Sequence, residues 1–524
     1  MFRMPDMSEW FNLGDFMLDR HVREGRGNKA AIYYRNQVIT YAELQKSANQ
    51  MGNALLEAGI EEENRVMICL PDCPEFLYTY FGAMRIGAIP VPISTMALPQ
   101  DYKYYLNDSR GKLLVTDAKL APNFTAAAGD LKYLRRFIVV GEAEPGQSTF
   151  NDFIKDASTS LDVAQTSKDD MAFWLYSSGT TGQPKGVVHM HHDALYFMPV
   201  FCEDVLQITE NDIVYSASKM YFSYGRNSME SVFFSGAAVL LEQELPKPGV
   251  VVENITRYKP TVYYSIPTSY IGVLDLLDKM DLEEGKYDLS SLRVCISSGE
   301  ALPKVVFDRW KARFGTEILE AIGSTDVGGD YISNMIGKVK NGSCGVLLPG
   351  FEAKLLDEDG NEAPDGEIGV LWINNDGTTP FYWRKHDKTK EAIKGVWFNT
   401  GDQFIRDSDG FYWFSGRADD MLKAGGIWVS PVEVEAFMLE HPAVLECGVA
   451  GYTDESKLEK PMAFVVLREG YEGSPELEKE LLNFVRDKTA HYKCPRRIEF
   501  TDELPRTATG KIQRYKLRTL LKNN

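Results

Sequence analysis

Long apolar runs are missing from this chain of 524 residues, because no stretch reaches the roughly 18 unbroken apolar residues of a membrane span. The opening residues, MFRMPDMSEWFNLGDF, lack a basic patch followed by an apolar core, so no secretory signal is visible. Cysteine is also scarce. The seven cysteines are an odd number without any C-x-x-C pair, which argues against a disulfide framework or a zinc site. We therefore expect a cytoplasmic protein whose cysteines are buried, reduced thiols.

Positive charge is under-represented, with 57 Lys and Arg against 75 Asp and Glu and a formal net charge of −18. Such a surface repels nucleic acid and anionic lipid headgroups, so we expect neither as a partner. The apolar fraction of 44% and the charged fraction of 25% are typical of a soluble globular protein. A disordered chain, a collagen-like repeat and a coiled coil are excluded.

The C-terminal end reverses this charge balance. From His491 onward nine basic residues face three acidic ones, Glu499, Asp502 and Glu503. The basic residues are Lys493, Arg496, Arg497, Arg506, Lys511, Arg514, Lys516, Arg518 and Lys522. A local basic surface on an acidic protein suits a polyanionic small ligand, and the alternative is an ordinary solvated helix surface.

Short apolar runs alternate with amphipathic stretches over the first four-fifths of the chain. The pattern predicts a helix over residues 74–87 and strands over residues 66–70, 88–93, 113–115, 137–140, 171–176 and 213–216. Repeated strand–helix alternation indicates an α/β fold with parallel sheets covered on both faces. Ligands of such sheets bind in the loops at the carboxyl ends of the strands.

The pattern changes after Arg417, where we place the boundary between an N-terminal domain, residues 1–417, and a C-terminal domain, residues 418–524. Ser430 before Pro431 is typical of a helix start. Strands are expected over residues 463–467 and 498–500 and a helix over residues 475–490, which makes a small α+β domain. The junction, GRADDMLKAGG, is charged and contains glycine, as expected of a hinge.

A glycine-rich segment, Ser177–Gly186, directly follows an apolar strand. Its glycines free backbone N–H groups, its Ser and Thr side chains add hydroxyls, and Lys185 adds a positive charge, a combination that can wrap phosphates. It is not a Walker loop, because Pro184 precedes the lysine and Gly186 follows it. The alternative is a surface turn rich in small residues.

This segment resembles the phosphate loop of the adenylate-forming superfamily, which includes acyl-CoA synthetases, peptide-synthetase adenylation domains and luciferases. Four further signatures of that superfamily recur in order, at Ala321–Asp326, Trp397–Asp402, Gly416–Lys423 and Pro505–Lys511. The resemblance implies a large N-terminal domain of parallel αβ layers with a barrel-like subdomain, followed by a small mobile α+β domain. It also implies ATP, Mg²⁺ and coenzyme A as cofactors and a small-molecule carboxylic acid as substrate.

The implied chemistry is activation of a carboxylate. Attack of the carboxylate on the α-phosphate of ATP gives an acyl-adenylate, and the crowded negative charge must be offset by metal and cationic side chains. By resemblance Lys511 bridges the acyl carboxylate and the α-phosphate, Asp326 holds Mg²⁺ and Thr325 touches phosphate oxygens. Asp326 departs from the usual Glu of the family, and its shorter side chain puts direct contact with the metal in doubt.

The nucleotide-binding residues implied by the resemblance form three groups. The phosphate loop contributes Ser177, Ser178, Gly179, Thr180, Thr181, Gly182 and Lys185; the adenine-flanking segments contribute Ser298, Gly299, Glu300, Ala301, Ala321, Ile322, Gly323 and Ser324; the ribose side contributes Asp402 and Arg417. Four of the implied site residues also have a structural alternative. Asp402 fits an ordinary turn and Arg417 fits an interdomain ion pair. Asp326 fits a capping residue, and Lys511 fits one more basic residue of the C-terminal tail.

Asp419 resembles the pivot about which the small domain turns after adenylation, and Lys423, Gly425 and Gly426 resemble the face it then presents to the pantetheine arm of coenzyme A. Without the resemblance, a plain loop is an equal interpretation of this segment.

The acyl-pocket segments resemble those of benzoate–CoA ligases. The residues concerned are Phe222, Ser223, Tyr224, Gly323, Gly329 and Asp330. Residues 220–225 contain no acidic side chain, which disfavours an amino acid as substrate. Where benzoate ligases carry a bulky His–Ile pair, this chain has Gly329 and Asp330, which predicts a wider pocket made partly polar by Asp330 or Arg226.

We therefore expect a carboxylate–CoA ligase, AMP-forming, for a benzoate-like aromatic or cyclic acid. The alternatives are a medium- or short-chain fatty acid–CoA ligase, a stand-alone adenylation protein that loads a carrier protein, and a catalytically silent nucleotide-binding protein. The sequence leaves the oligomeric state open between a monomer and a homodimer.

Overall fold

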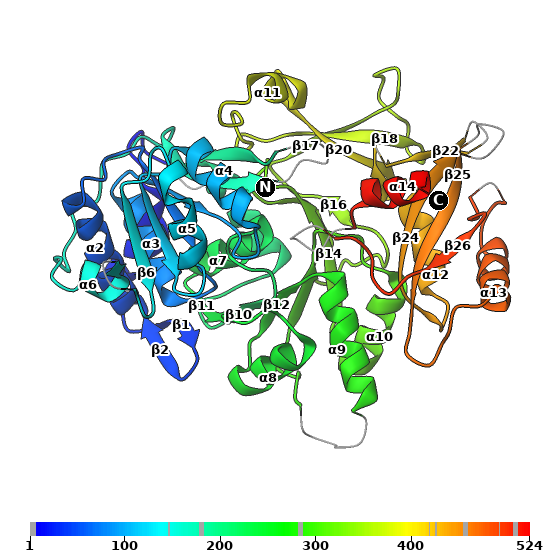
Figure 1. Ribbon diagram of the computed structural model, residues 1–524, viewed down its shortest axis with the longest axis horizontal. Coiled ribbons are helices and arrows are strands. Elements are labelled where there is room, and N and C mark those ends of the chain that lie inside the picture. The colour runs from blue at the N-terminus through cyan, green and yellow to red at the C-terminus, as the bar shows by residue number, and fades with distance from the viewer. Residues whose placement is uncertain are drawn as a thin grey trace.

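The structure is a computed structural model of residues 1–524 (Figure 1). It describes residues 7–144, 147–177, 183–280, 287–418, 420–424, 427–453, 459–491, 493–506 and 512–523. The N-terminal elements, blue to cyan, lie at one end of the molecule and the C-terminal elements, orange to red, at the other, with the antiparallel strands in yellow-green between and above them. The expected α/β class is confirmed.

A five-stranded parallel sheet forms the N-terminal end. Its strands, in spatial order, are β4 (Ile89–Pro92), β3 (Arg65–Cys69), β5 (Leu113–Asp117), β6 (Arg136–Val140) and β7 (Ser148–Thr149). The helices of this region include α2 (Tyr41–Glu57), α3 (Pro74–Arg85), α4 (Pro99–Ser109) and α6 (Phe150–Ile154). Helix α2 begins with a capping box, in which Thr40 accepts the Glu43 N–H and the Glu43 side chain accepts the Thr40 N–H.

A second, fourteen-stranded sheet runs through the rest of the large domain. Its parallel part is β14 (Ile318–Gly323), β13 (Val294–Ser297), β12 (Val262–Ser265), β10 (Ile213–Ser216), β11 (Ala238–Leu241) and β1 (Ala30–Tyr34), with β2 (Gln37–Thr40) antiparallel at the edge. The connecting helices are α7 (Ser223–Ser235), α8 (Pro248–Tyr258), α9 (Pro267–Lys279) and α10 (Lys304–Phe314).

The expected barrel-like part consists of antiparallel strands that continue this sheet beyond β14. They are β15 (Asp330–Ser333), β16 (Gly345–Leu347), β21 (Phe411–Arg417), β20 (Trp397–Arg406), β18 (Ile368–Asn374) and β17 (Glu352–Leu356), with β19 (Ile393–Lys394) beside β20 and α11 (His386–Ala392) before it. The change from parallel to antiparallel pairing occurs between β14 and β15. Strand direction therefore reverses at the segment that the sequence assigns to the site.

The strand expected over residues 171–176 is present as β8 (Met171–Ser177), but it does not belong to a parallel sheet. It pairs antiparallel with β9 (Lys185–Met190) in a two-stranded ribbon. The continuous apolar run fits both arrangements, because β8 is buried against neighbours on both faces, as a parallel strand would be.

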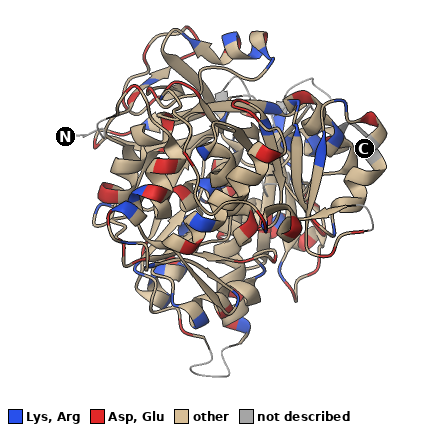
Figure 2. Cartoon of the chain, turned by 90° about the vertical axis from the view of Figure 1, so that its left-hand side faces the viewer, with Lys and Arg blue, Asp and Glu red and all other residues tan. Residues whose placement is uncertain are grey.

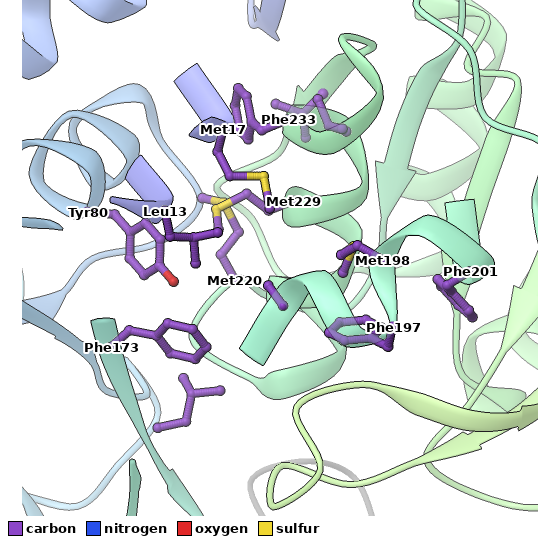
Figure 3. Close-up of a cluster of buried hydrophobic side chains, with 14 of the residues drawn as sticks. Leu13, Met17, Tyr80, Phe173, Phe197, Met198, Phe201, Met220, Met229 and Phe233 are labelled. Carbon is purple, nitrogen blue, oxygen red and sulfur yellow. The ribbon is translucent and has the colours of Figure 1, made fainter. Parts of the chain in front are cut away.

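One large apolar core joins these parts. Leu13 and Met17 near the N-terminus, Tyr80 of α3, Phe173 of β8 and Met229 of α7 converge in it (Figure 3). All seven cysteines are buried and unpaired, which confirms the prediction of reduced thiols. None of the helices in the described parts of the chain is both long and apolar enough to cross a membrane.

The C-terminal part has a three-stranded sheet of β24 (Val444–Thr453), β25 (Glu459–Leu467) and β26 (Ile498–Phe500), together with the small ribbon β22 (Leu422–Ala424) and β23 (Ile427–Val429). Its helices are α12 (Pro431–Leu439), α13 (Pro475–Arg486) and α14 (Arg514–Asn523). Ser430 caps α12 as expected, because its side chain accepts the Glu433 N–H. Helix α13 ends at Arg486, four residues earlier than the pattern predicted.

At least three of the nine basic C-terminal residues are paired with carboxylates. Arg514 pairs with Glu435 at 2.6 Å, Arg518 with Asp420 at 2.9 Å, and Lys493 with Glu433 at 2.7 Å. The positive charge of these three residues is neutralised by carboxylates of the same C-terminal part, and the charge of this end alone does not decide between a polyanionic ligand and a solvated helix surface. At the opposite, N-terminal end of the molecule, acidic and basic segments are interleaved (Figure 2).

Candidate nucleotide and acyl site

The two ends of the glycine-rich loop are held together by the β8–β9 ribbon. Ser177, the last residue of β8, is in register with Lys185, the first of β9. The loop residues Ser178, Gly179, Thr180, Thr181 and Gly182 lie outside the described part of the chain. Because strand pairing fixes its two ends, the loop begins and ends at one place next to the Lys185 side chain.

Lys185 points at the segment that carries Asp326. Its Nζ donates to Asp326 Oδ1 at 2.9 Å and lies 3.7 Å from the centre of the Tyr382 ring. The Asp326 side chain is largely buried, and burial together with the charge of Asp326 raises the pKa of Tyr382 well above its usual value. The site therefore contains a cation and a carboxylate, held by residues far apart in the sequence.

Two buried side chains, His189 and Arg226, donate hydrogen bonds to backbone carbonyls of the turn between β14 and β15, residues 324–329. His189 Nε2 donates to the Thr325 carbonyl at 2.8 Å, since a carbonyl oxygen only accepts, and His189 Nδ1 lies 2.8 Å from Asp193 Oδ2. The Arg226 guanidinium donates to the Gly328 carbonyl. Thr325 itself is half-buried, so the turn is fixed on its inner side while its outer side stays accessible.

The adenine-flanking segments lie side by side at the carboxyl ends of β13 and β14 in the large sheet. Residues 298–301 follow β13 and residues 321–323 end β14, and these strands are parallel neighbours. Gly299 has a φ of +93°, and a Cβ there would meet nothing within 4 Å, so its backbone borders open space. The Glu320 carboxyl accepts the Leu302 N–H at 3.1 Å and thereby ties the two segments together.

Glu320 is buried, and burial raises its pKa to about 8. The Cys344 thiol donates to the same carboxyl oxygen at 3.6 Å. The carboxyl is therefore mostly protonated at neutral pH, which lowers the cost of burying it without a cation.

Asp402 and Arg417 are cross-strand partners on β20 and β21. Arg417 donates to Asp402 Oδ1 at 2.8 Å and to the Thr400 carbonyl at 2.8 Å. Gly401 has a φ of +71°, and a Cβ there would lie 2.7 Å from the Arg417 guanidinium, so this turn requires glycine. One partner of Arg417 is thus the other ribose-side residue, within the large domain, and the interdomain ion pair stays an alternative.

Tyr331 is buried beside Asp330 on β15. Burial raises its pKa well above the usual value, and the charges of Asp402, Arg417, Asp330 and Asp326 also act on it. The ribose-side pair, Asp326 and Asp330 are thus close enough to influence one buried phenol.

The expected acyl-pocket residues lie on α7 and on the β14–β15 turn. Phe222, the residue that precedes α7, and Ser223 and Tyr224 in its first turn are half-buried, as is Gly323. The Tyr224 hydroxyl donates to the Ile296 carbonyl at 3.0 Å. Asp330 is buried and accepts the Ser298 hydroxyl at 3.0 Å, and burial raises its pKa to about 7.

The expectation that Gly329 widens the pocket needs correction. A Cβ at Gly329 would lie 2.3 Å from Cε2 of Phe197, so the Phe197 ring already occupies the space that a side chain would take. The expected polar role of Arg226 is also corrected, because its guanidinium pairs with Glu230 and with the Gly328 carbonyl and covers the Phe173 ring at 4.5 Å. Asp330 keeps one carboxyl oxygen, Oδ2, without a hydrogen-bond partner among the described residues.

Several predicted site residues cannot be placed. Asp419, Gly425, Gly426 and Lys511 lie outside the described residues, and for Lys423 only the backbone is described, paired with Trp428 across β22 and β23.

The large and C-terminal parts meet next to the adenine-flanking segment. Arg506, within the predicted lysine motif Pro505–Lys511, has its guanidinium 3.7 Å from the Glu300 carboxylate and 3.0 Å from the Glu446 carboxylate. Further away, Arg468 donates to Asp275 of α9 at 2.8 Å.

The sequence matches two models of known protein families. The family model of AMP-binding enzymes matches residues 18–383, and the model of the AMP-binding enzyme C-terminal domain matches residues 433–511. The chain belongs to the AMP-binding enzyme family.

Relatives of this AMP-binding enzyme act on aromatic acids. It is 40% identical to the benzoate–CoA ligase of Thauera aromatica, over 98% of this chain and 96% of that protein. The crystal structure of the anthranilate CoA ligase AuaEII with anthranoyl-AMP superposes with a TM-score of 0.95, at 38% identity over 100% of this chain and 99% of that one. The crystal structure of a benzoate CoA ligase from Burkholderia xenovorans LB400 superposes with a TM-score of 0.88. The two sequences are 36% identical over 97% of this chain and 100% of that one.

Sequence reasoning missed four residues of the AMP-binding enzyme's site: His189, Phe197, Tyr331 and Tyr382. A histidine inside the apolar strand that follows the glycine-rich loop was a usable signal for His189. Tyr382 forms an isolated bridge with Val187, which is 195 positions away in the sequence, and no local pattern predicts such a contact.

Asp326 fits a magnesium ligand. The described residues contain no cluster of three or more His, Cys, Asp or Glu that could hold a metal without help. Mg²⁺ usually takes one or two carboxylates and completes its coordination with water and substrate phosphates. One buried carboxylate beside the phosphate loop matches that requirement.

Proposed function

We propose that this protein is an AMP-forming ligase that joins an aromatic carboxylic acid to coenzyme A. The observation that carries the proposal is the 40% identity to a benzoate–CoA ligase across 98% of the chain. The site geometry supports it, since Lys185, Asp326 and the Asp402–Arg417 pair lie around one edge of the sheet.

In the first half-reaction a carboxylate oxygen attacks the α-phosphorus of ATP, and the bond from that phosphorus to the pyrophosphate oxygen breaks. Lys185 and Lys511 offset negative charge on the phosphates, Thr325 orients phosphate oxygens, and Asp326 holds Mg²⁺. Bound Mg²⁺ neutralises part of the phosphate charge. Asp402 accepts hydrogen bonds from the ribose hydroxyls, with two oxygens for the task.

In the second half-reaction the thiol of coenzyme A attacks the acyl carbon. The carbon–oxygen bond to AMP breaks, and the thiol proton leaves to solvent. We propose that residues 418–524 turn about Asp419 between the two steps and exchange Lys511 for the face formed by Lys423, Gly425 and Gly426. Domain rotation of this kind is an established form of switching.

The acid binds between α7 and the β14–β15 turn, against Phe222, Ser223, Tyr224 and Gly323. Their half-buried positions next to the adenine-flanking segments support this placement. We also propose a cytoplasmic location, because ATP and coenzyme A are supplied there. A homodimer stays a prediction, which light scattering on the purified protein tests.

Pyrophosphate–ATP exchange tests the proposed function. Labelled pyrophosphate is followed into ATP with benzoate, aminobenzoates, hydroxybenzoates, cyclohexanecarboxylate and fatty acids of short and medium length. Exchange is expected with aromatic acids, and thioester formation is expected when coenzyme A is added. Exchange without thioester formation would indicate a stand-alone adenylation protein, and exchange with fatty acids alone would contradict the aromatic assignment.

A further inference from the structure

Asp330 is a buried carboxylate with an unused acceptor. Its side chain, at the first position of β15, is 1% exposed. Oδ1 accepts the Ser298 hydroxyl at 3.0 Å, whereas Oδ2 has no hydrogen-bond partner among the described residues. A buried acceptor without a partner is costly and uncommon, so it calls for an explanation.

Two neighbouring polar groups have other partners. The Tyr224 hydroxyl donates to the Ile296 carbonyl, and the Arg226 guanidinium pairs with Glu230 and donates to the Gly328 carbonyl. Burial raises the Asp330 pKa and the Ser298 hydrogen bond lowers it, and no cation in the described part of the chain pairs with the carboxylate. Asp330 Oδ2 is therefore a hydrogen-bond acceptor that no described residue uses.

The carboxyl group of Asp330 borders the proposed acyl site. A Cβ at Gly323 would lie 2.5 Å from Asp330 Oδ1, so the carboxyl group packs directly against the glycine, with Oδ2 on the same group. Gly323, Phe222 and Tyr224 are all half-buried, which makes them the accessible border of the same region. A ring held between α7 and the β14–β15 turn therefore lies beside Asp330.

We infer that Asp330 is a specificity-determining residue that accepts a hydrogen bond from a donor substituent on the aromatic ring, so that the substrate class is amino- or hydroxy-substituted aromatic acids. This inference rests on the proposed function. It goes beyond that function because an unsubstituted ring would leave Oδ2 without a partner.

The wild-type protein tests the inference without any variant. The kcat/KM for adenylation is compared for 2-, 3- and 4-aminobenzoate and for the methylbenzoate with the same ring position, since methyl and amino groups are similar in size. Hydroxybenzoates are compared with fluorobenzoates in the same way. A preference of roughly 10- to 100-fold for the donor is expected at one ring position or more, because a site with a buried acceptor discriminates against an analogue that leaves it unpaired.

Two variants locate the effect. Asp330→Leu should reduce the amino-to-methyl ratio to about one or reverse it, as the acceptor is replaced by an apolar side chain. Glu320→Gln is the matched control, because Glu320 is another buried carboxyl with a raised pKa but is bound to the Leu302 N–H. Its ratio should equal that of the wild type.

The inference is overturned if the wild-type protein shows no donor preference at any ring position, or if an active Asp330→Leu protein keeps the preference. Exchange with benzoate but equal rates for amino and methyl acids would sink this inference and leave the proposed function standing. Absence of exchange with every acid would remove the proposed function, and the inference with it. If Asp330→Leu does not fold, the wild-type ratios decide.

Discussion

Glu320 and Asp330 are buried carboxyl groups that satisfy their acceptors differently. Glu320 binds a backbone N–H and a thiol, whereas the Ser298 hydroxyl is the one hydrogen-bond partner of the Asp330 carboxyl among the described residues. Within the same part of the chain no cation pairs with either carboxyl, and burial raises the pKa of both. Glu320 therefore holds the adenine-flanking segment through the Leu302 N–H, whereas Asp330 keeps one oxygen that a ligand can use.

Glu320 should make the stability of the protein depend on pH. Its folded pKa of about 8 lies above its ordinary value, so between those values the unfolded chain binds fewer protons and the free energy of unfolding falls as pH rises. Glu320→Gln removes this effect, on the order of a few kcal/mol. The melting temperature of the wild type should therefore fall relative to that of Glu320→Gln between pH 5 and pH 8.5. Parallel pH profiles for the two proteins would show that the Glu320 pKa is not raised.

At the residue scale, the sequence predicted side chains whose role follows from a local motif. Asp402 and Arg417 are 15 positions apart, each within its own motif, and strand pairing joins them. Phe197 and Tyr382 could not be predicted, because their contacts with Gly329 and Lys185 depend on how separate elements pack. The mistaken expectation about Gly329 has the same cause: the sequence shows a missing side chain but not the ring that fills its place.

At the element scale, the β14–β15 turn is held by contacts with three other segments of the chain. Its inner side contacts His189, Arg226 and Phe197, all from other elements. A turn fixed in this way holds Thr325 and Asp326 in one orientation before any substrate binds, which lowers the cost of organising the site.

Gly329→Ala should therefore destabilise the protein, by about 1–3 kcal/mol, because the new methyl group overlaps the Phe197 ring. The matched control is Gly249→Ala, since a Cβ at Gly249 meets nothing within 4 Å. Thermal unfolding should show a lower melting temperature for Gly329→Ala only, with partial recovery when Phe197→Leu is added. Equal melting temperatures for both single variants would contradict the packing described for this turn.

Element types followed from the sequence more readily than element partners. The apolar runs at β3, β5, β6 and β10 became parallel strands as predicted, and the same kind of run at β8 became one arm of an antiparallel ribbon. A continuous apolar run indicates that a strand is buried on both faces, but it does not indicate which other strand pairs with it. The cap of α12 was predictable because Ser430 and Glu433 interact within one turn.

At the scale of the whole molecule, ion pairs join the described residues of the C-terminal part to the large one. Arg506 contacts Glu300 and Arg468 contacts Asp275 with half-buried side chains, and Lys279 contacts Glu469 on an exposed surface. The exposed Lys279–Glu469 pair stabilises only weakly, so it does not oppose a C-terminal domain that turns during the reaction.

The proposed rotation predicts that the two half-reactions respond differently to one variant. Lys511→Ala should abolish pyrophosphate–ATP exchange, because the charge on the α-phosphate loses its partner. Thioester formation from a supplied acyl-adenylate should stay close to the wild-type rate, as Lys511 has then moved away. Single-turnover assays of each step measure the two rates, and equal loss of both would remove Lys511 from its assigned role.

The central claim is that this protein activates an aromatic acid by attaching AMP to it. Its most direct measurement is the incorporation of labelled pyrophosphate into ATP, with Mg²⁺ present and one acid added at a time. The account predicts incorporation that depends on an aromatic carboxylate and is absent without acid. No incorporation with any carboxylate, from a folded protein that binds ATP, would contradict it.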